Sequence, residues 1–255
     1  MNIKTLKETW LAEAAEAHIH GWDFSHIHHR YTEETDLPWD YEQLIRKYCK
    51  DSYKLLDIDT GGGEFLLALK HPYANTSCTE DYDPNVQLCK ETLLPLGIDF
   101  HRGTAENLPF PDAIFDLVIN RHGDLCAAEL NRVLKPGGLF ITEQVGENND
   151  RELVELLLPG TPKPFSGLNL HDQSQIFQQA GFTILKAEEA YRPIRFFDVG
   201  ALVWFAHILE WEFPGFTVEG CMDRLLAAQR ILERDKEIVG SIHRYLLIVR
   251  KQENI

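Results

Sequence analysis

The chain has 255 residues, 44% of them hydrophobic, which suffices for one α/β domain with additions. Its formal net charge of −15 opposes nucleic-acid binding, which usually leaves a basic footprint. No apolar run approaches the roughly 20 residues of a membrane-spanning helix, so we expect neither a nucleic-acid nor a membrane partner.

The first 50 residues predict a helical cap. Apolar spacing predicts an amphipathic helix over 6–17, and a second helix is expected over 41–49. The segment between them is rich in histidine and aromatic residues. Its aromatic side chains, Trp22, Phe24 and Tyr31, either line a substrate pocket or simply pack, and the sequence favours neither alternative.

Five histidines lie in this segment, and a metal site is one interpretation of them. His18 with His20, or His26 with His28, would have to converge. No His-Glu-x-x-His pattern is present. Exposed or core-edge histidines are therefore favoured, and no metal is predicted.

A glycine-rich loop follows at 59–63. It comes after the apolar run Leu55–Ile58 and contains Gly61, Gly62 and Gly63, and a helix-like segment follows it. A buried strand, a tight glycine turn and a helix N-terminus let a ligand touch backbone N–H groups. Glycine permits both the close approach and a positive φ. The stretch predicts a nucleotide-type binding loop.

The residues after the glycines disfavour phosphate ligands. A P-loop needs Gly-Lys-Ser/Thr, but Glu64 and Phe65 follow Gly63. A dinucleotide loop needs a third glycine where Leu66 stands. The carboxylate of Glu64 would also repel a pyrophosphate. A nicotinamide oxidoreductase is therefore disfavoured.

The loop instead resembles motif I of class I S-adenosylmethionine (SAM) methyltransferases, an acid-x-Gly-x-Gly-x-Gly pattern after a strand. Asp57, Gly61 and Gly63 match it, and Asp59 stands at the first glycine. The resemblance implies SAM as cofactor, and an acidic loop suits its sulfonium and ammonium. Aspartate tolerates a left-handed backbone. Its carboxylate either faces the ammonium or crowds the cofactor.

The second strand is expected over 75–80 and ends in Glu80. This acid lies 19 residues past Gly61, the spacing at which a carboxylate reaches a ribose in Rossmann-like folds. Ribose hydroxyls are donors, and a carboxylate is a strong acceptor for them. A surface acid at a strand end is the weaker alternative. A helix over 84–94 follows.

The third strand, 98–103, leads into a stretch that resembles the family's G-D-A-E-x-L-P-F-x-D-x-x-F-D. Leu108-Pro109-Phe110 and Phe115-Asp116 match, and Thr104 stands where the family has an aspartate on the adenine amino group. The resemblance implies further cofactor contacts at Thr104, Ala105, Glu106 and Asn120.

The fourth strand, 117–120, is followed by Arg121 and His122. Open α/β sheets bind ligands outside the carboxyl ends of their strands. In the resembled family the reacting substrate atom lies just past this strand. His122 is therefore a candidate base and Arg121 a candidate clamp for an anionic group. A turn residue without chemistry is the alternative for His122.

A helix from residue 127 to Lys135, a Pro-Gly-Gly stop and a fifth strand are typical of the same family and architectural. A helix over 172–180 and a strand over 182–187 follow. An aromatic-rich insertion contains the apolar segment 199–209, which is either buried or packs over the active site, with Trp204 a candidate substrate contact. The remaining predicted elements are a helix over 225–237 and a strand over 241–250.

We therefore expect a doubly wound, Rossmann-like sheet, mostly parallel, with an antiparallel last strand. The expected divisions are a cap (1–50), a SAM-binding core (51–190), a lid (191–240) that selects the acceptor, and the final core strand (241–255). The predicted activity is methyl transfer from SAM to an O, N or S atom of a small molecule. The alternative is a SAM-binding but degenerate module, because Asp59 and Thr104 depart from the family motifs.

Location and assembly rest on composition. Five scattered cysteines without a Cys-x-x-Cys pattern indicate a reduced, cytoplasmic protein. The N-terminus carries charges but no apolar signal region, so export is not expected. A monomer or homodimer is expected.

Overall fold

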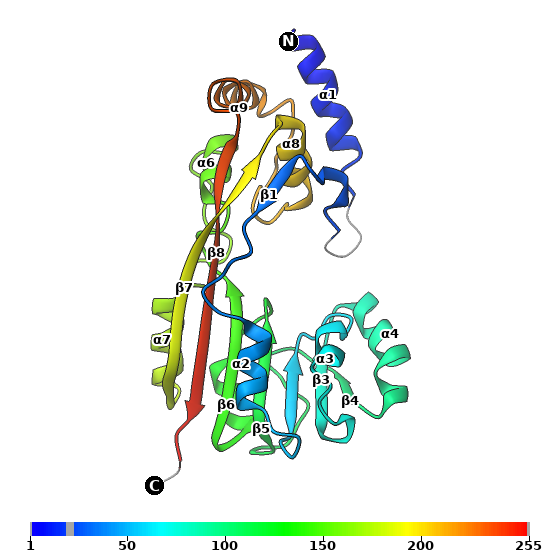
Figure 1. The fold of residues 1–255 in the computed structure, drawn as a ribbon, viewed down its shortest axis with the longest axis vertical. Coiled ribbons are helices and arrows are strands. Elements are labelled where there is room, and N and C mark those ends of the chain that lie inside the picture. The colour runs from blue at the N-terminus through cyan, green and yellow to red at the C-terminus, as the bar shows by residue number, and fades with distance from the viewer. Residues whose placement is uncertain (1, 19–22, 254–255) are drawn as a thin grey trace. The chain divides into compact units, whose positions relative to one another are not determined.

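The computed structural model describes residues 2–18 and 23–253 (Figure 1). Its strands form an eight-stranded sheet in the order β1-β7-β8-β6-β5-β2-β3-β4. The chain divides into two compact units. Unit 1 comprises Met1–Leu37, Glu147–Ser166 and Tyr191–His243, and unit 2 comprises Pro38–Gly146, Gly167–Ala190 and Arg244–Ile255. No helix of the described residues is long and apolar enough to cross a membrane.

Unit 2 is built on a parallel sheet. Five of its strands run parallel in the order β6-β5-β2-β3-β4, and β8 pairs with β6 in the antiparallel direction. The parallel strands are β2 (Leu55–Ile58), β3 (Thr76–Glu80), β4 (Asp99–Arg102), β5 (Phe115–Arg121) and β6 (Leu134–Val145). The predicted mixed sheet with an antiparallel last strand is confirmed.

All four residues of β2 are buried, as expected for a central parallel strand with both faces covered. Alternate residues of the sheet, such as Leu56, Val118 and Phe140, pack on one face with Leu130 and Phe177. The helices of unit 2 are α2 (Tyr41–Tyr48), α3 (Glu64–Leu69), α4 (Asp83–Thr92), α5 (Ala127–Val133) and α7 (Leu170–Gln179).

One predicted helix end is wrong. Helix α5 ends at Val133, and β6 begins at the next residue, so the Pro-Gly-Gly run belongs to the strand. Lys135 does not complete a helix but pairs with Asp116 of β5 at 2.7 Å. The strand accommodates the irregular residues because the β5–β6 register shifts there, and a Cβ at Gly138 would collide with the carbonyl oxygen of Lys135.

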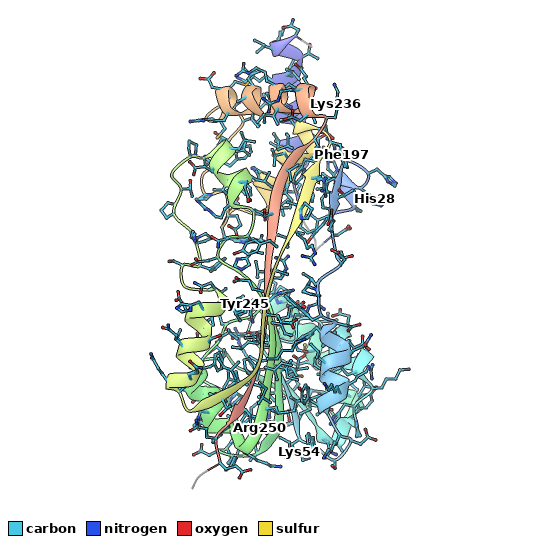
Figure 2. The ribbon with its side chains drawn as sticks, turned by 60° about the vertical axis from the view of Figure 1, so that its left-hand side comes forward. His28, Lys54, Phe197, Lys236, Tyr245 and Arg250 are labelled. Carbon is cyan, nitrogen blue, oxygen red and sulfur yellow. The ribbon has the colours of Figure 1, made fainter. Side chains whose placement is uncertain are left out.

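Two long strands run through the last part of the chain. Strand β7 (Phe182–Phe196) extends well beyond the predicted 182–187, because its burial continues to alternate along its length. Strand β8 (Ile238–Lys251) begins after the αL cap of Lys236 and passes Tyr245 and Arg250 (Figure 2). Both strands contribute residues to each unit.

Unit 1 has its own hydrophobic core around α8 (Val199–Ile208), eight of whose ten residues are buried. The core draws Trp10 from α1 (Ile3–Ala15), Leu153 from α6 (Arg151–Leu157) and Leu225 from α9 (Met222–Asp235). Of the two alternatives for 199–209, burial is therefore correct. Neither α6 nor the short β1 (Tyr31–Glu33), which pairs with β7, was predicted.

Candidate functional site

The glycine loop alternates ordinary and left-handed backbone. Asp59, Gly61 and Gly63 have φ values of 56°, 62° and 84°, and α3 begins immediately afterwards. Asp59 thus adopts the conformation that a glycine would supply, as the tolerance of aspartate for this region predicts. The substitution leaves the loop with the turn that a close ligand approach requires.

Glu80 ties this loop to the neighbouring strand. Its buried carboxylate accepts hydrogen bonds from the backbone N–H groups of Gly61, Asp81 and Tyr82, each at 2.9 Å. It also accepts one from Asn85 Nδ2 at 3.3 Å. The acid predicted to reach a ribose therefore lies at the carboxyl end of β3, directly against the loop.

The loop is strongly acidic. Asp57 is buried and accepts a hydrogen bond from Thr60 Oγ1 at 2.7 Å. Burial, with the nearby Asp59 and Glu80, raises the pKa of Asp57 to about 7. Burial, Glu80 and Asp124 likewise raise the pKa of Asp59 to about 7. None of the groups that shift these pKa values is a cation, so the site is matched to a positively charged ligand.

A second loop is fastened to the first through Asp59. Its Oδ2 accepts a hydrogen bond from the backbone N–H of Asp124 at 3.1 Å. A Cβ at Gly123 would collide with the Asp59 carboxylate and with the Asn120 amide. Glycine is required at 123 for this close approach, and the chain after β5 is held against the glycine loop.

Three further predicted cofactor contacts follow β4. Thr104 forms an isolated bridge with Asn107, Ala105 is buried, and Glu106 is exposed. Glu106 also contributes to the raised pKa of Asp59, which places its charge near the same loop.

Asn120 serves as an internal crosslink. Its Nδ2 donates to the carbonyl oxygen of Ile58 at 3.1 Å, and its Oδ1 accepts from Gln144 Nε2 at 2.5 Å. The buried side chain thereby joins β2, β5 and β6 at their carboxyl ends. Tyr41 supports the same edge, since its hydroxyl donates to the carbonyl oxygen of Asn120 at 2.9 Å.

Arg121 and His122 gather around the buried Glu143. Glu143 Oε2 accepts a hydrogen bond from Trp39 Nε1 at 2.6 Å, and Oε1 lies 3.3 Å from Arg121 Nε and 3.8 Å from His122 Nε2. The Arg121 guanidinium lies 5.8 Å from the centre of the Phe65 ring. Neither Trp39 nor Glu143 was predicted from the sequence. The available signal was an acidic residue, Glu143, inside the mostly apolar run 139–145.

The basicity of His122 is low. Burial, with the charges of Arg244 and Arg121, lowers its pKa to about 3, so the imidazole is neutral at pH 7. A neutral ring can accept a hydrogen bond, but with so low a pKa it is a weak general base. Its backbone is left-handed, with φ at 62°, and its N–H donates to the carbonyl oxygen of Glu143.

The aromatic candidates lie in unit 1, whereas Arg121 and His122 belong to unit 2. The Phe24 ring packs edge-on against Trp204 at 5.7 Å and lies 6.3 Å from Tyr31. Trp204 is 1% exposed in the unit 1 core. These contacts have the character of packing, and Trp22 lies outside the described residues.

The histidine-rich segment has structural contacts of its own. His26 Nε2 lies 2.8 Å from a carboxylate oxygen of Glu13, and its ring stacks on Trp204. Within residues 2–18 and 23–253, no group of three His, Cys, Asp or Glu residues could hold a metal ion. His20 lies outside those residues.

Comparison with known sequences agrees with the geometry of unit 2. A family model of a methyltransferase domain matches residues 56–142. A phthiotriol/phenolphthiotriol dimycocerosates methyltransferase of Mycobacterium tuberculosis is 33% identical over 143 residues, 53% of this chain and 49% of that protein. A fatty-acid O-methyltransferase of Mycolicibacterium smegmatis is 33% identical over 88 residues, 32% of each chain. The chain thus spans about half the length of the first of these relatives and about a third of the second.

Solved structures share the fold. A SAM-dependent methyltransferase from Methanosarcina mazei has a TM-score of 0.52 at 17% identity, covering 83% of this chain and 98% of its own. The [4+2]-cyclase SpnF has a TM-score of 0.51 at 20% identity, covering 84% of this chain and 81% of its own. A cyclase with this fold shows that architecture alone does not fix the reaction. Residues 56–142, which hold the glycine loop and the acid at the end of β3, thus match a methyltransferase-domain model, within a fold that solved methyltransferases share.

Proposed function

We propose that this chain transfers a methyl group from SAM to an O, N or S atom of a small molecule. The observation that carries the proposal is the left-handed backbone at 59, 61 and 63, held by Glu80 at the carboxyl ends of two parallel strands. The predicted cofactor contacts are Asp57, Asp59, Gly61, Gly63, Glu80, Thr104, Ala105, Glu106 and Asn120.

The residues present fit this cofactor. SAM would supply an electrophilic methyl group on a sulfonium, and it carries two positive charges and one carboxylate. Burial, with neighbouring carboxylates and no cationic partner, raises the pKa values of Asp57 and Asp59. A cationic ligand relieves that repulsion. A ligand can approach the backbone closely at the glycines, while the N–H groups of Gly61 and Gly63 are donated to Glu80 and to the carbonyl oxygen of Thr60.

The chain's contribution to the reaction is placement of the acceptor. The Arg121 guanidinium lies at the end of β5, its Nε turned to Glu143, where its terminal nitrogens can orient an anionic group. His122, neutral at pH 7, accepts a hydrogen bond from Arg121 Nε at its Nε2, at 3.4 Å, which leaves Nδ1 to interact with the substrate. Alignment of the nucleophile in line with the methyl group supplies most of the rate enhancement that such a reaction needs.

The degenerate alternative gains no support. Asp59 keeps the left-handed turn, and its carboxylate is engaged by the second loop. The name of the fatty-acid O-methyltransferase specifies an oxygen acceptor, so oxygen acceptors are the first to try. The cytoplasmic location, the monomer or homodimer, and acceptor selection by 1–50 and 191–240 remain predictions.

Calorimetric titration with SAM and S-adenosylhomocysteine tests the cofactor assignment. Gly61→Ala and Gly215→Ala are a matched pair, because both glycines have positive φ and open space where a Cβ would stand. Both variants carry the same backbone strain, but only the first places a methyl group in the cofactor loop. We expect micromolar SAM binding by the unaltered chain, a loss of at least about tenfold in Gly61→Ala, and no change in Gly215→Ala.

Asp59→Gly completes the test. Binding by the unaltered chain and by this variant supports the proposal. Binding only after Asp59 is replaced would mean that the loop is disabled in the natural sequence. Absence of binding in both would overturn the cofactor assignment. Transfer of label from methyl-labelled SAM to a panel of alcohols, carboxylic acids, amines and thiols then tests the activity itself.

A further inference from the structure

Unit 1 contains a hollow of about 1020 Å³, and none of the residues that line it is among the predicted cofactor contacts or is Arg121 or His122. They come from the segment after β6, from α6 and the loop that follows it, from β7 and from α9. The lining residues are Asn148, Arg151, Glu152, Glu155, Leu156, Pro159, Tyr191 and Arg224.

The two carboxylates of the hollow already have protein donors. Glu152 accepts hydrogen bonds from the backbone N–H and the hydroxyl of Ser241, at 3.1 and 2.8 Å. Glu155 Oε2 accepts from the backbone N–H of Gly160 at 3.1 Å. Neither forms an ion pair with an arginine among the residues that the structure describes.

The two arginines of the hollow have N–H groups without an acceptor among the described residues. Arg151 Nη2 donates to the carbonyl oxygen of Thr161 at 2.7 Å, whereas its Nη1 is buried and has no acceptor among the described residues. Arg224 is exposed on α9 and has no hydrogen bond or ion pair within the described part of the chain. A buried N–H group without an acceptor is costly, and a bound acceptor recovers that cost.

The aromatic wall of the hollow is held in place. Tyr191 stacks on His243 with ring centres 4.4 Å apart and ring planes 13° apart. Its hydroxyl oxygen accepts a hydrogen bond from Asn148 Nδ2 at 3.2 Å, which leaves the phenol proton free to donate. Leu156 and Pro159 add apolar surface.

We propose that this hollow binds a small organic anion whose carboxylate meets Arg151 and Arg224 and whose apolar part lies along Tyr191. Donors outnumber free acceptors there, and guanidinium groups match the geometry of a carboxylate. A concave site with apolar walls and a few converging polar groups is the usual form of a small-ligand site. The inference concerns binding alone and does not depend on methyl transfer.

Benzoate is the probe, and benzamide is its neutral counterpart of the same shape. Ligand-detected NMR titration of the full chain, without SAM, is expected to give a Kd for benzoate of roughly 1 mM, in keeping with a ligand of this size. Benzamide is expected to bind at least about tenfold more weakly, because it cannot form the charge-assisted pairs.

The variants Arg224→Gln and Arg230→Gln are matched, since both side chains are exposed on α9 and only Arg224 lines the hollow. We expect Arg224→Gln to weaken benzoate binding about fivefold and Arg230→Gln to leave it unchanged. Arg151→Gln should weaken it further; a circular dichroism spectrum checks that this variant folds. No benzoate binding at 10-fold the expected Kd, equal binding of benzamide, or equal effects of the two α9 variants would each overturn the proposal.

Discussion

At the scale of single residues, Asp59 has two roles, of which a glycine could fill only the first. It supplies the left-handed turn of the glycine loop and accepts a hydrogen bond from the backbone N–H of Asp124. Its carboxylate is held among other acids, and its pKa is raised from 3.8 to about 7. Because the raised pKa reports an unfavourable charge in the folded state, this carboxylate costs stability once it ionises.

The sign of that cost predicts the behaviour of Asp59→Asn. The folded protein holds the proton of Asp59 between pH 4 and 7, where the unfolded chain has released it, so this group's contribution to stability falls as pH rises through that window. Asparagine keeps an acceptor for Asp124 and tolerates the left-handed turn. We expect Asp59→Asn to raise the melting temperature at pH 8 and to leave it nearly unchanged at pH 4, measured by differential scanning calorimetry.

A stabilisation of equal size at both pH values would contradict this account, because it would not arise from the charge. The same variant should bind SAM more weakly than the unaltered chain at pH 8, while binding of S-adenosylhomocysteine, which lacks the sulfonium charge, should change less.

At the scale of elements, the sequence predicts the strands of unit 2 and the glycine loop, because both depend on local patterns of burial and backbone freedom. It does not predict the Trp39–Glu143 hydrogen bond, whose partners are 104 residues apart in the chain. Nor does it predict that Asn120 crosslinks three strands. Such partners depend on register, which neither residue reveals alone.

The same distance in sequence explains the end of α5. Lysine, proline and two glycines are ordinary signals for the end of a helix, and they predicted a stop at Lys135. The β5–β6 register shift and the pairing of Lys135 with Asp116 are tertiary features, and with them the helix ends at Val133, two residues before Lys135. In unit 1, the run 199–209, apolar on most faces, predicted either burial or packing over the active site, and the structure shows it buried.

The Trp39–Glu143 pair makes a prediction about the edge of the sheet. Trp39→Phe removes the indole Nε1 donor and leaves Oε2 of the buried Glu143 without that hydrogen bond. We expect a loss of about 1–3 kcal/mol in the free energy of unfolding, measured by urea denaturation. In a Glu143→Gln background the loss should be smaller, because a neutral acceptor needs the donor less. An equal loss in both backgrounds would assign the effect to packing alone.

At the scale of the whole molecule, charge and ligand have opposite signs. The chain carries a formal charge of −15, SAM carries a net charge of +1, and S-adenosylhomocysteine carries none. Surface charges beyond about 10 Å are screened at 0.1 M salt, whereas the buried Asp57 and the half-buried Asp59 are screened much less. Salt therefore separates the contribution of the whole surface from that of the loop.

We expect the SAM dissociation constant to rise about two- to fivefold between 50 and 500 mM NaCl, and that of S-adenosylhomocysteine to stay within the error of the titration. The remaining preference for SAM at 500 mM reports the carboxylates of the loop, and it should shrink in Asp59→Asn. An equal salt dependence for the two ligands would mean that the surface charge does not distinguish the sulfonium. The acidity of this chain would then serve its solubility and not its cofactor.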